Sequence, residues 1–84
     1  MKKVDERKYY FNAELSMSVV ESRTLDILGK FYGSFVVYVD VMGEIDETWL
    51  DLRVRMANGV YVSVVIRYNE NLNTWIASFE KIDK

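Results

Sequence analysis

The sequence predicts a mainly β (α+β) fold, a single twisted antiparallel sheet of about five strands with one short helix after the first strand. Apolar and polar residues alternate in several segments that are separated by short stretches typical of turns. Half of the 84 residues are apolar and 14% are aromatic, enough for an ordered core in a short chain. The short connections predict a meander, whose twist is compatible with a half-open barrel.

We expect one domain over residues 1–84, because the chain has no proline, no linker rich in Gly and Ser, and no internal repeat. Residues 1–8 are mostly charged and predict a frayed lead-in. No apolar run approaches the roughly 18 residues of a membrane span, and none follows the basic N-terminus as in a secretion signal. With no cysteine, the sequence is compatible with a reducing compartment, and we expect a cytoplasmic protein without membrane contact.

The first predicted element is a long, half-buried strand over residues 9–19, where apolar residues recur at every second position. The side chains expected to face the core are those of Tyr9, Phe11, Ala13, Leu15, Met17 and Val19.

A short helix is predicted over residues 22–32. Leu25, Leu28 and Phe31 lie at helical spacing and are expected to close the core, and Gly33 stands where a helix would end. A strand through the same segment remains an alternative, because Gly29 weakens a helix.

Three further strands are predicted over residues 34–41, 49–56 and 60–68, and the first two are separated by a loop at 42–48. Alternation places one side chain in two on the core side of each strand. The residues expected there are Phe35, Val37, Val39 and Val41 in the first, Leu50, Leu52, Val54 and Met56 in the second, and Val60, Val62, Val64 and Ile66 in the third.

The Asn58-Gly59 pair predicts a hairpin between the last two of these strands. A two-residue turn would mix charged and apolar side chains on both faces. A three-residue loop that includes Ala57 pairs Met56 with Val60 and gathers the apolar side chains on one face. Gly59 would then occupy the left-handed position of a bulged turn.

The last segment, residues 72–82, fits two structures. The spacing of Leu72, Ile76 and Phe79 is compatible with a helix. Trp75, Ala77 and Phe79 stand at every second position, which is compatible with a strand. We favour the strand because the segment is β-prone and the Asn-rich stretch before it resembles a hairpin loop.

The predicted register leaves an unusual second face on these strands, where aromatic and apolar residues alternate with arginines. The candidate interface residues are Trp49, Arg53, Arg55, Tyr61, Arg67 and Tyr38, with Val36, Asp40 and Val65 beside them. The helix or a terminal segment could cover part of this face. Otherwise the mixture is typical of a contact surface for a protein partner or for a second copy of the chain. Nucleic acid is a further alternative, in which arginines contact phosphates and aromatic rings stack on bases.

An acidic group surrounds the loop at 42–48 and consists of Asp40, Glu44, Asp46, Glu47 and Asp51. The simplest expectation is a solvated loop, and a docking patch for a basic partner is the next. The spacing does not match a calcium-binding EF-hand, so we expect no metal site.

The chain offers little for catalysis, since it has neither His nor Cys and no catalytic motif. A net charge of −2 gives no overall attraction to nucleic acid. We expect a cofactor-free, non-catalytic module that binds a protein or self-associates as a homodimer. It would act as an inhibitor or adaptor that occludes a surface, of the kind that phages and other mobile elements encode. The alternative is a single-stranded nucleic-acid-binding domain that uses the same face.

Overall fold

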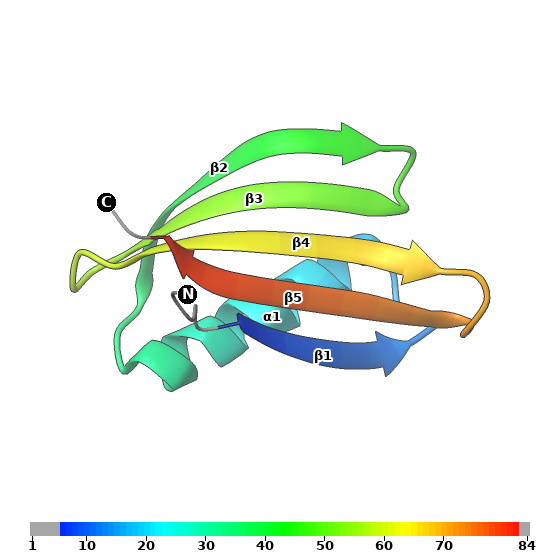
Figure 1. Cartoon of the computed structure of the whole chain (residues 1–84), viewed down its shortest axis with the longest axis horizontal. Helices are drawn as coiled ribbons and strands as arrows, with labels where there is room; N and C mark the ends of the chain where they lie inside the picture. Colours follow the sequence, from blue (N-terminus) through cyan, green and yellow to red (C-terminus); the bar gives the residue numbers. More distant parts are fainter. Residues whose placement is uncertain (1–5, 83–84) are drawn as a thin grey trace, which may run out of the picture.

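The computed structural model describes residues 6–82 and contains one five-stranded antiparallel sheet and one helix (Figure 1). The elements are β1 (Glu6–Asn12), α1 (Met17–Tyr32), β2 (Val36–Ile45), β3 (Trp49–Met56), β4 (Tyr61–Asn69) and β5 (Thr74–Ile82). Neighbouring strands follow the order β1-β5-β4-β3-β2. The predicted fold class is confirmed, with the helix after the first strand and a meander from β2 to β5. The half-open barrel is wrong, because β1 and β2 lie at opposite edges and do not pair.

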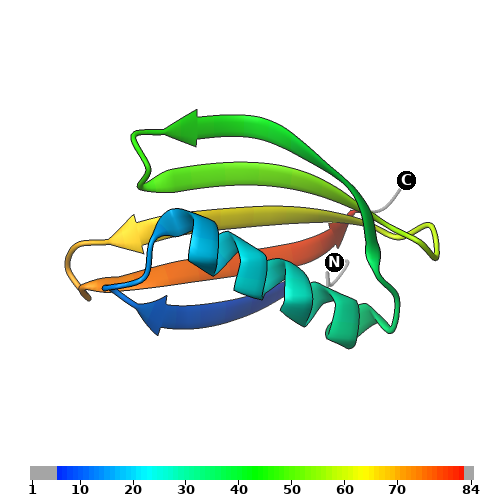
Figure 2. The same ribbon diagram turned by 180° about the vertical axis from the view of Figure 1, so that it is seen from behind.

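Helix α1 covers one face of the sheet and connects its two edges, as Figure 2 shows. Val20, Thr24 and Leu28 lie on its buried side, and the Thr24 hydroxyl donates to the Val20 carbonyl at 2.7 Å. The main core lies between helix and sheet. Its buried residues are Val20, Leu28, Leu50, Leu52, Val54, Met56, Val62, Val64, Ile66, Trp75, Ala77 and Phe79.

The predicted helix at 22–32 is confirmed and the strand alternative is wrong, but α1 begins earlier, at Met17. The Ser16 side chain caps it by accepting from the Val19 amide. At the other end Gly33 has φ 62°, and its amide donates to the Gly29 carbonyl, so the predicted helix stop is confirmed. Of the predicted core contacts, Leu28 is fully buried, whereas Phe31 is 36% exposed.

The first strand is shorter than predicted, because a turn starts at Asn12. The Asn12 carbonyl accepts from the Leu15 amide, and its side chain accepts from the Glu14 amide at 2.7 Å. The predicted strand over 9–19 is therefore wrong beyond Asn12, although Leu15 and Met17 still pack against the core. The predicted lead-in is wrong for residues 6–8, which belong to β1, and residues 1–5 lie outside the described residues.

Two β-bulges change the side-chain alternation of β2. The pairing runs from Val36 opposite Met56 to Tyr38 opposite Arg55, which leaves Val37 as an extra residue. A second shift, between Val41 and Gly43, leaves Met42 as another. β2 also continues to Ile45, so most of the predicted loop at 42–48 is strand.

The bulges overturn part of the predicted core side of β2. Phe35 and Val37 are 65% and 50% exposed, whereas Val36, expected on the second face, packs against the core. Val39 packs there as predicted. Val41 lies opposite the buried Leu52 and so shares its face, but it is 56% exposed because it stands at the sheet edge.

The predicted hairpin between β3 and β4 is confirmed. The Met56 amide donates to the Val60 carbonyl at 2.9 Å across a loop of residues 57–59, and Gly59 has φ 91°. The Asn58 side chain accepts from the Val60 amide, and the Asn58 amide donates to the Ser34 hydroxyl at 3.0 Å. The turn is thereby attached to the segment that follows α1.

Residues 74–82 form the strand that we favoured over a helix. Trp75, Ala77 and Phe79 are buried in the main core as predicted. Ile76 points to the other face but is only 6% exposed. Apolar residues on both faces of β5 are therefore buried, which explains why their spacing also fitted a helix. The Trp75 indole donates to the Leu15 carbonyl at 2.8 Å and so fixes the turn between β1 and α1.

Candidate functional site

The candidate site is the open face, which we define as the sheet surface opposite α1. In Figure 1 this face lies in front of the helix, and no other described element covers it. The expectation that the helix packs over part of it is therefore wrong for residues 6–82. All six candidate residues lie on this face, because none of them shares the side of the sheet that carries the core.

Strand register places the candidate residues in rows across the sheet. Arg55 on β3 lies opposite Tyr38 on β2 and Tyr61 on β4, so it stands between two phenol rings. Its guanidinium carbon is 5.9 Å from the centre of the Tyr38 ring, a cation–π distance. At the far end of the same strands, Trp49 lies opposite Arg67. The structure thus arranges the candidate residues in two clusters, a first one of Tyr38, Arg55 and Tyr61 and a second one of Trp49 and Arg67.

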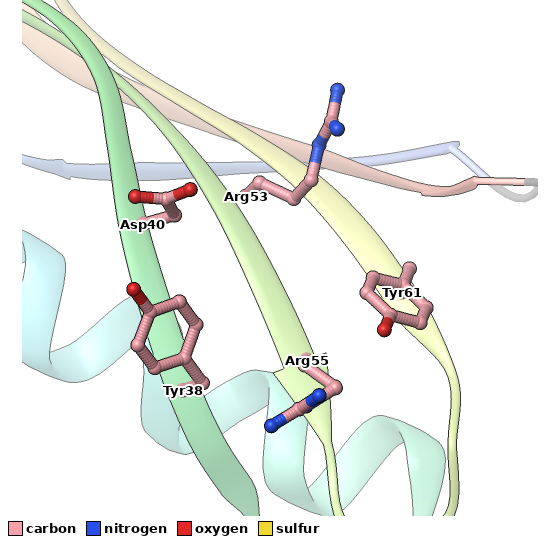
Figure 3. Close-up of a pocket in the computed structure, with 5 residues that line it drawn as sticks. All are labelled: Tyr38, Asp40, Arg53, Arg55 and Tyr61. Atoms are coloured by element: carbon pink, nitrogen blue, oxygen red, sulfur yellow. The ribbon is translucent and has the colours of Figure 1, made fainter.

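Between these clusters, Arg53 lies opposite Asp40 in the register, yet the two side chains form no ion pair within the described part of the chain. Figure 3 shows the Arg53 guanidinium turned away from the Asp40 carboxylate. Arg53 is exposed, and so is Asp40. Both charges are therefore available to a partner without breaking an internal contact.

The first cluster, together with Asp40 and Arg53 beside it, lines a shallow pocket of about 360 Å³ (Figure 3). Its lining consists of Tyr38, Asp40, Arg53, Arg55 and Tyr61. The two phenol groups offer apolar contact and hydroxyls that donate or accept, the two guanidinium groups offer donors, and the carboxylate offers acceptors. The size suits one side chain of a partner, and such a composition is common where protein interfaces concentrate their binding energy.

The second cluster packs against the backbone of β2. A Cβ atom on Gly43 would lie 3.1 Å from the Trp49 ring, so the indole rests against the bare backbone of β2. Trp49 is half-buried, while Ile45, its partner in the register, is 57% exposed. This end of the open face is therefore more apolar than the pocket.

Charges of both signs are spread over the open face. Besides the three arginines, register places Lys8 there, and the acidic side chains are those of Asp40, Asp51 and Glu80. Among these described side chains the four basic and three acidic groups nearly cancel.

Sequence reasoning missed the contribution of the edge strand β1 and its neighbour β5. Tyr10, which is 61% exposed, and Lys8 belong to the open face, as do Ile76 and Glu80. The alternation in residues 9–19 already separated Tyr10 from Tyr9. The missing information was that the first strand pairs with the last.

The predicted acidic group does not form one patch. Asp40 and Asp51 lie on the open face, Glu44 lies opposite the core residue Leu50, and Asp46 and Glu47 form the turn between β2 and β3. Within residues 6–82 no three carboxylates lie close enough together to hold a metal ion.

Comparison with protein-family models, curated proteins and solved structures found no match to the chain. The helix of the described region is too short and too polar to cross a membrane. What the open face does is therefore inferred from its own geometry.

Proposed function

We propose that the protein is a non-catalytic binding module that recognises a polypeptide through the open face. The observation that carries the proposal is the pocket between Tyr38 and Tyr61, with Arg53 exposed and free of any ion pair to described residues. A partner side chain in this pocket would contact both rings and accept from a guanidinium group. Arginine and tyrosine are among the residues that contribute most to protein interfaces.

The balanced charge of the open face supports a protein partner over the alternative, single-stranded nucleic acid. The partner can be another protein or a second copy of the chain. In either case the module acts by occupying a surface, as an inhibitor or adaptor does, and the lack of cysteine suits a cytoplasmic setting.

The test is the double variant Arg53→Glu with Tyr61→Ser, compared with Arg23→Glu on the exposed side of α1. Tagged proteins are used to capture partners from a host lysate, and sedimentation measures self-association. We expect the double variant to lose about tenfold in binding while it remains folded, because about 1.4 kcal/mol is lost from the contact. Arg23→Glu is expected to bind like the wild type.

Equal binding by the double variant would contradict the proposal. So would tight binding of labelled single-stranded oligonucleotides with a steep salt dependence, since that result would assign the face to nucleic acid. Circular dichroism and thermal unfolding of each variant separate loss of binding from loss of fold.

A further inference from the structure

The free edge of β2 is the second unusual surface of the molecule. Among the strands of residues 6–82, β2 is the longest and has only one neighbour in the sheet, and its bounds include no Lys, Arg or Pro. Most of the exposed large apolar side chains lie on it or next to it: Phe35, Val37, Tyr38, Val41, Met42 and Ile45. The opposite edge, β1, is shorter and carries Arg7 and Lys8, which discourage strand addition.

The hydrogen bonds around the next strand show where the backbone groups of β2 point. The Met56 amide donates toward β4, to Val60, and the Ala57 amide donates to the Phe35 carbonyl on the β2 side. Backbone groups alternate in direction along an antiparallel strand, so those of Val54 and Leu52 also point to β4. Val39 and Val41 lie opposite these two residues. Their N–H and C=O groups therefore point away from the sheet, to the free edge.

The two bulges limit the length of this edge. Val37 and Met42 interrupt the regular pleat, so the segment Tyr38–Val41 remains as an uninterrupted template. At about 3.4 Å per residue it is roughly 14 Å long and pairs with about four residues of an added strand. Such a short ladder suits a peptide segment rather than a whole edge-to-edge sheet.

Charge decides between the possible occupants of the edge. The Asp40 side chain lies on the open face between Val39 and Val41, whose backbone groups point to the free edge. Glu44, Asp46 and Glu47 follow in the sequence without a basic residue among them. When the two-fold axis of an antiparallel pair of copies lies beside Asp40, which is the register that joins the outward backbone groups of Val39 and Val41, Asp40 of one copy would face Asp40 of the other. Like charges directly opposite each other destabilise a sheet, so a second copy fits poorly.

We infer that β2 accepts an extended segment of a partner protein as a sixth strand, antiparallel to Tyr38–Val41. The segment carries Lys or Arg opposite Asp40 and an apolar residue on each side of it. The basic side chain lies beside the Tyr38–Tyr61 pocket, and the two apolar side chains lie next to Val39 and Val41 on the helix side. The inference rests on the proposed function in one respect, that the ligand is a polypeptide.

The probes are two labelled peptides of about nine residues, one with the core Val-Lys-Val and one with Val-Glu-Val, flanked by Ser and Gly. Amide chemical shifts and hydrogen exchange of the whole protein report binding. We expect the lysine peptide to shift and protect the amides of Val39 and Val41 and to bind about fivefold more tightly than the glutamate peptide. In Asp40→Lys the preference for the two peptides reverses.

Two variants serve as controls. Val41→Pro removes an outward N–H and is expected to abolish binding of both peptides, whereas Arg23→Glu on the exposed side of α1 leaves the preference unchanged. If Val41→Pro does not fold, the reversal in Asp40→Lys alone decides.

Equal affinity for the two peptides, or shifts confined to β1, would overturn the inference. The inference would also be overturned if the wild-type protein forms a dimer whose stability changes in Asp40→Lys. That result would place a second copy of the chain on the edge. If partner capture depends on Arg53 and Tyr61 while the peptides fail, the proposed function stands and the edge site does not.

Discussion

The substitution Gly59→Ala isolates the backbone energy of the hairpin between β3 and β4. Gly59 has φ 91°, and a Cβ atom at this position would meet no other atom within 4 Å. The cost of the new methyl group is therefore the left-handed conformation itself, about 1 to 2 kcal/mol for an L-residue. Alanine also restricts the unfolded chain, which offsets about 0.4 to 1 kcal/mol. The expected net loss of stability is about 1 kcal/mol.

In a domain of 84 residues this loss lowers the melting temperature by about 4 to 8 °C. Urea and thermal unfolding, followed by circular dichroism, measure it. Gly33→Ala is the comparison, because Gly33 also has a positive φ, 62°, and a methyl group there would likewise meet no other atom within 4 Å. Midpoints unchanged by Gly59→Ala, or amide assignments that pair Ala57 with Val60, would refute the bulged turn.

Three further substitutions test other parts of the fold. Glu47→Gly should raise the free energy of unfolding by about 0.5 to 1 kcal/mol, because Glu47 has φ 82° in the turn between β2 and β3. An unchanged midpoint in urea unfolding would mean that this backbone conformation costs no stability. Val62→Ala should cost about 1 to 3 kcal/mol and Ser63→Ala less than about 0.5 kcal/mol, and equal midpoints would mean that the faces of β4 are misassigned. Trp75→Phe should cost about 1 to 2 kcal/mol, because the Leu15 carbonyl loses its donor, and a neutral result in thermal unfolding would contradict the anchoring role of the indole.

The sequence was sufficient to predict β3 and β4, because apolar residues stand at every second position on both sides of Asn58 and Gly59. It was misleading for β2, where each extra residue, Val37 and Met42, changes which face the next side chain joins. The bulge at Val37 leaves no sign in the sequence, since its neighbours Val36 and Tyr38 are good strand formers.

The start of α1 was missed for a related reason. Leu15 and Met17 continue the alternation of β1 by position alone, although the chain has already turned at Asn12. The polar residue Thr24 on the buried side of the helix also weakened the helical pattern. The available signal was Ser16, a residue that often caps helices. A single capping residue is weaker evidence than the alternation of apolar residues that continues through the same segment.

The candidate site could be predicted where it depends on local register. Arg53, Arg55 and Tyr61 follow from the hairpin alone. Lys8 and Tyr10 do not, because they join the open face through a pairing between residues far apart in the chain.

That pairing sets an order for folding. Within residues 6–82 β1 pairs only with β5, from Asn12 opposite Thr74 to Glu6 opposite Glu80, so the first strand of the sheet to be synthesised has no sheet partner until the last is made. The hairpins between β2 and β5 are local and can form early, whereas closing β1 onto β5 carries the entropy cost of a long loop. During synthesis Tyr9 and Phe11 would therefore stay exposed longest, and the nascent chain would depend on late docking of β1 to become resistant to proteases and aggregation.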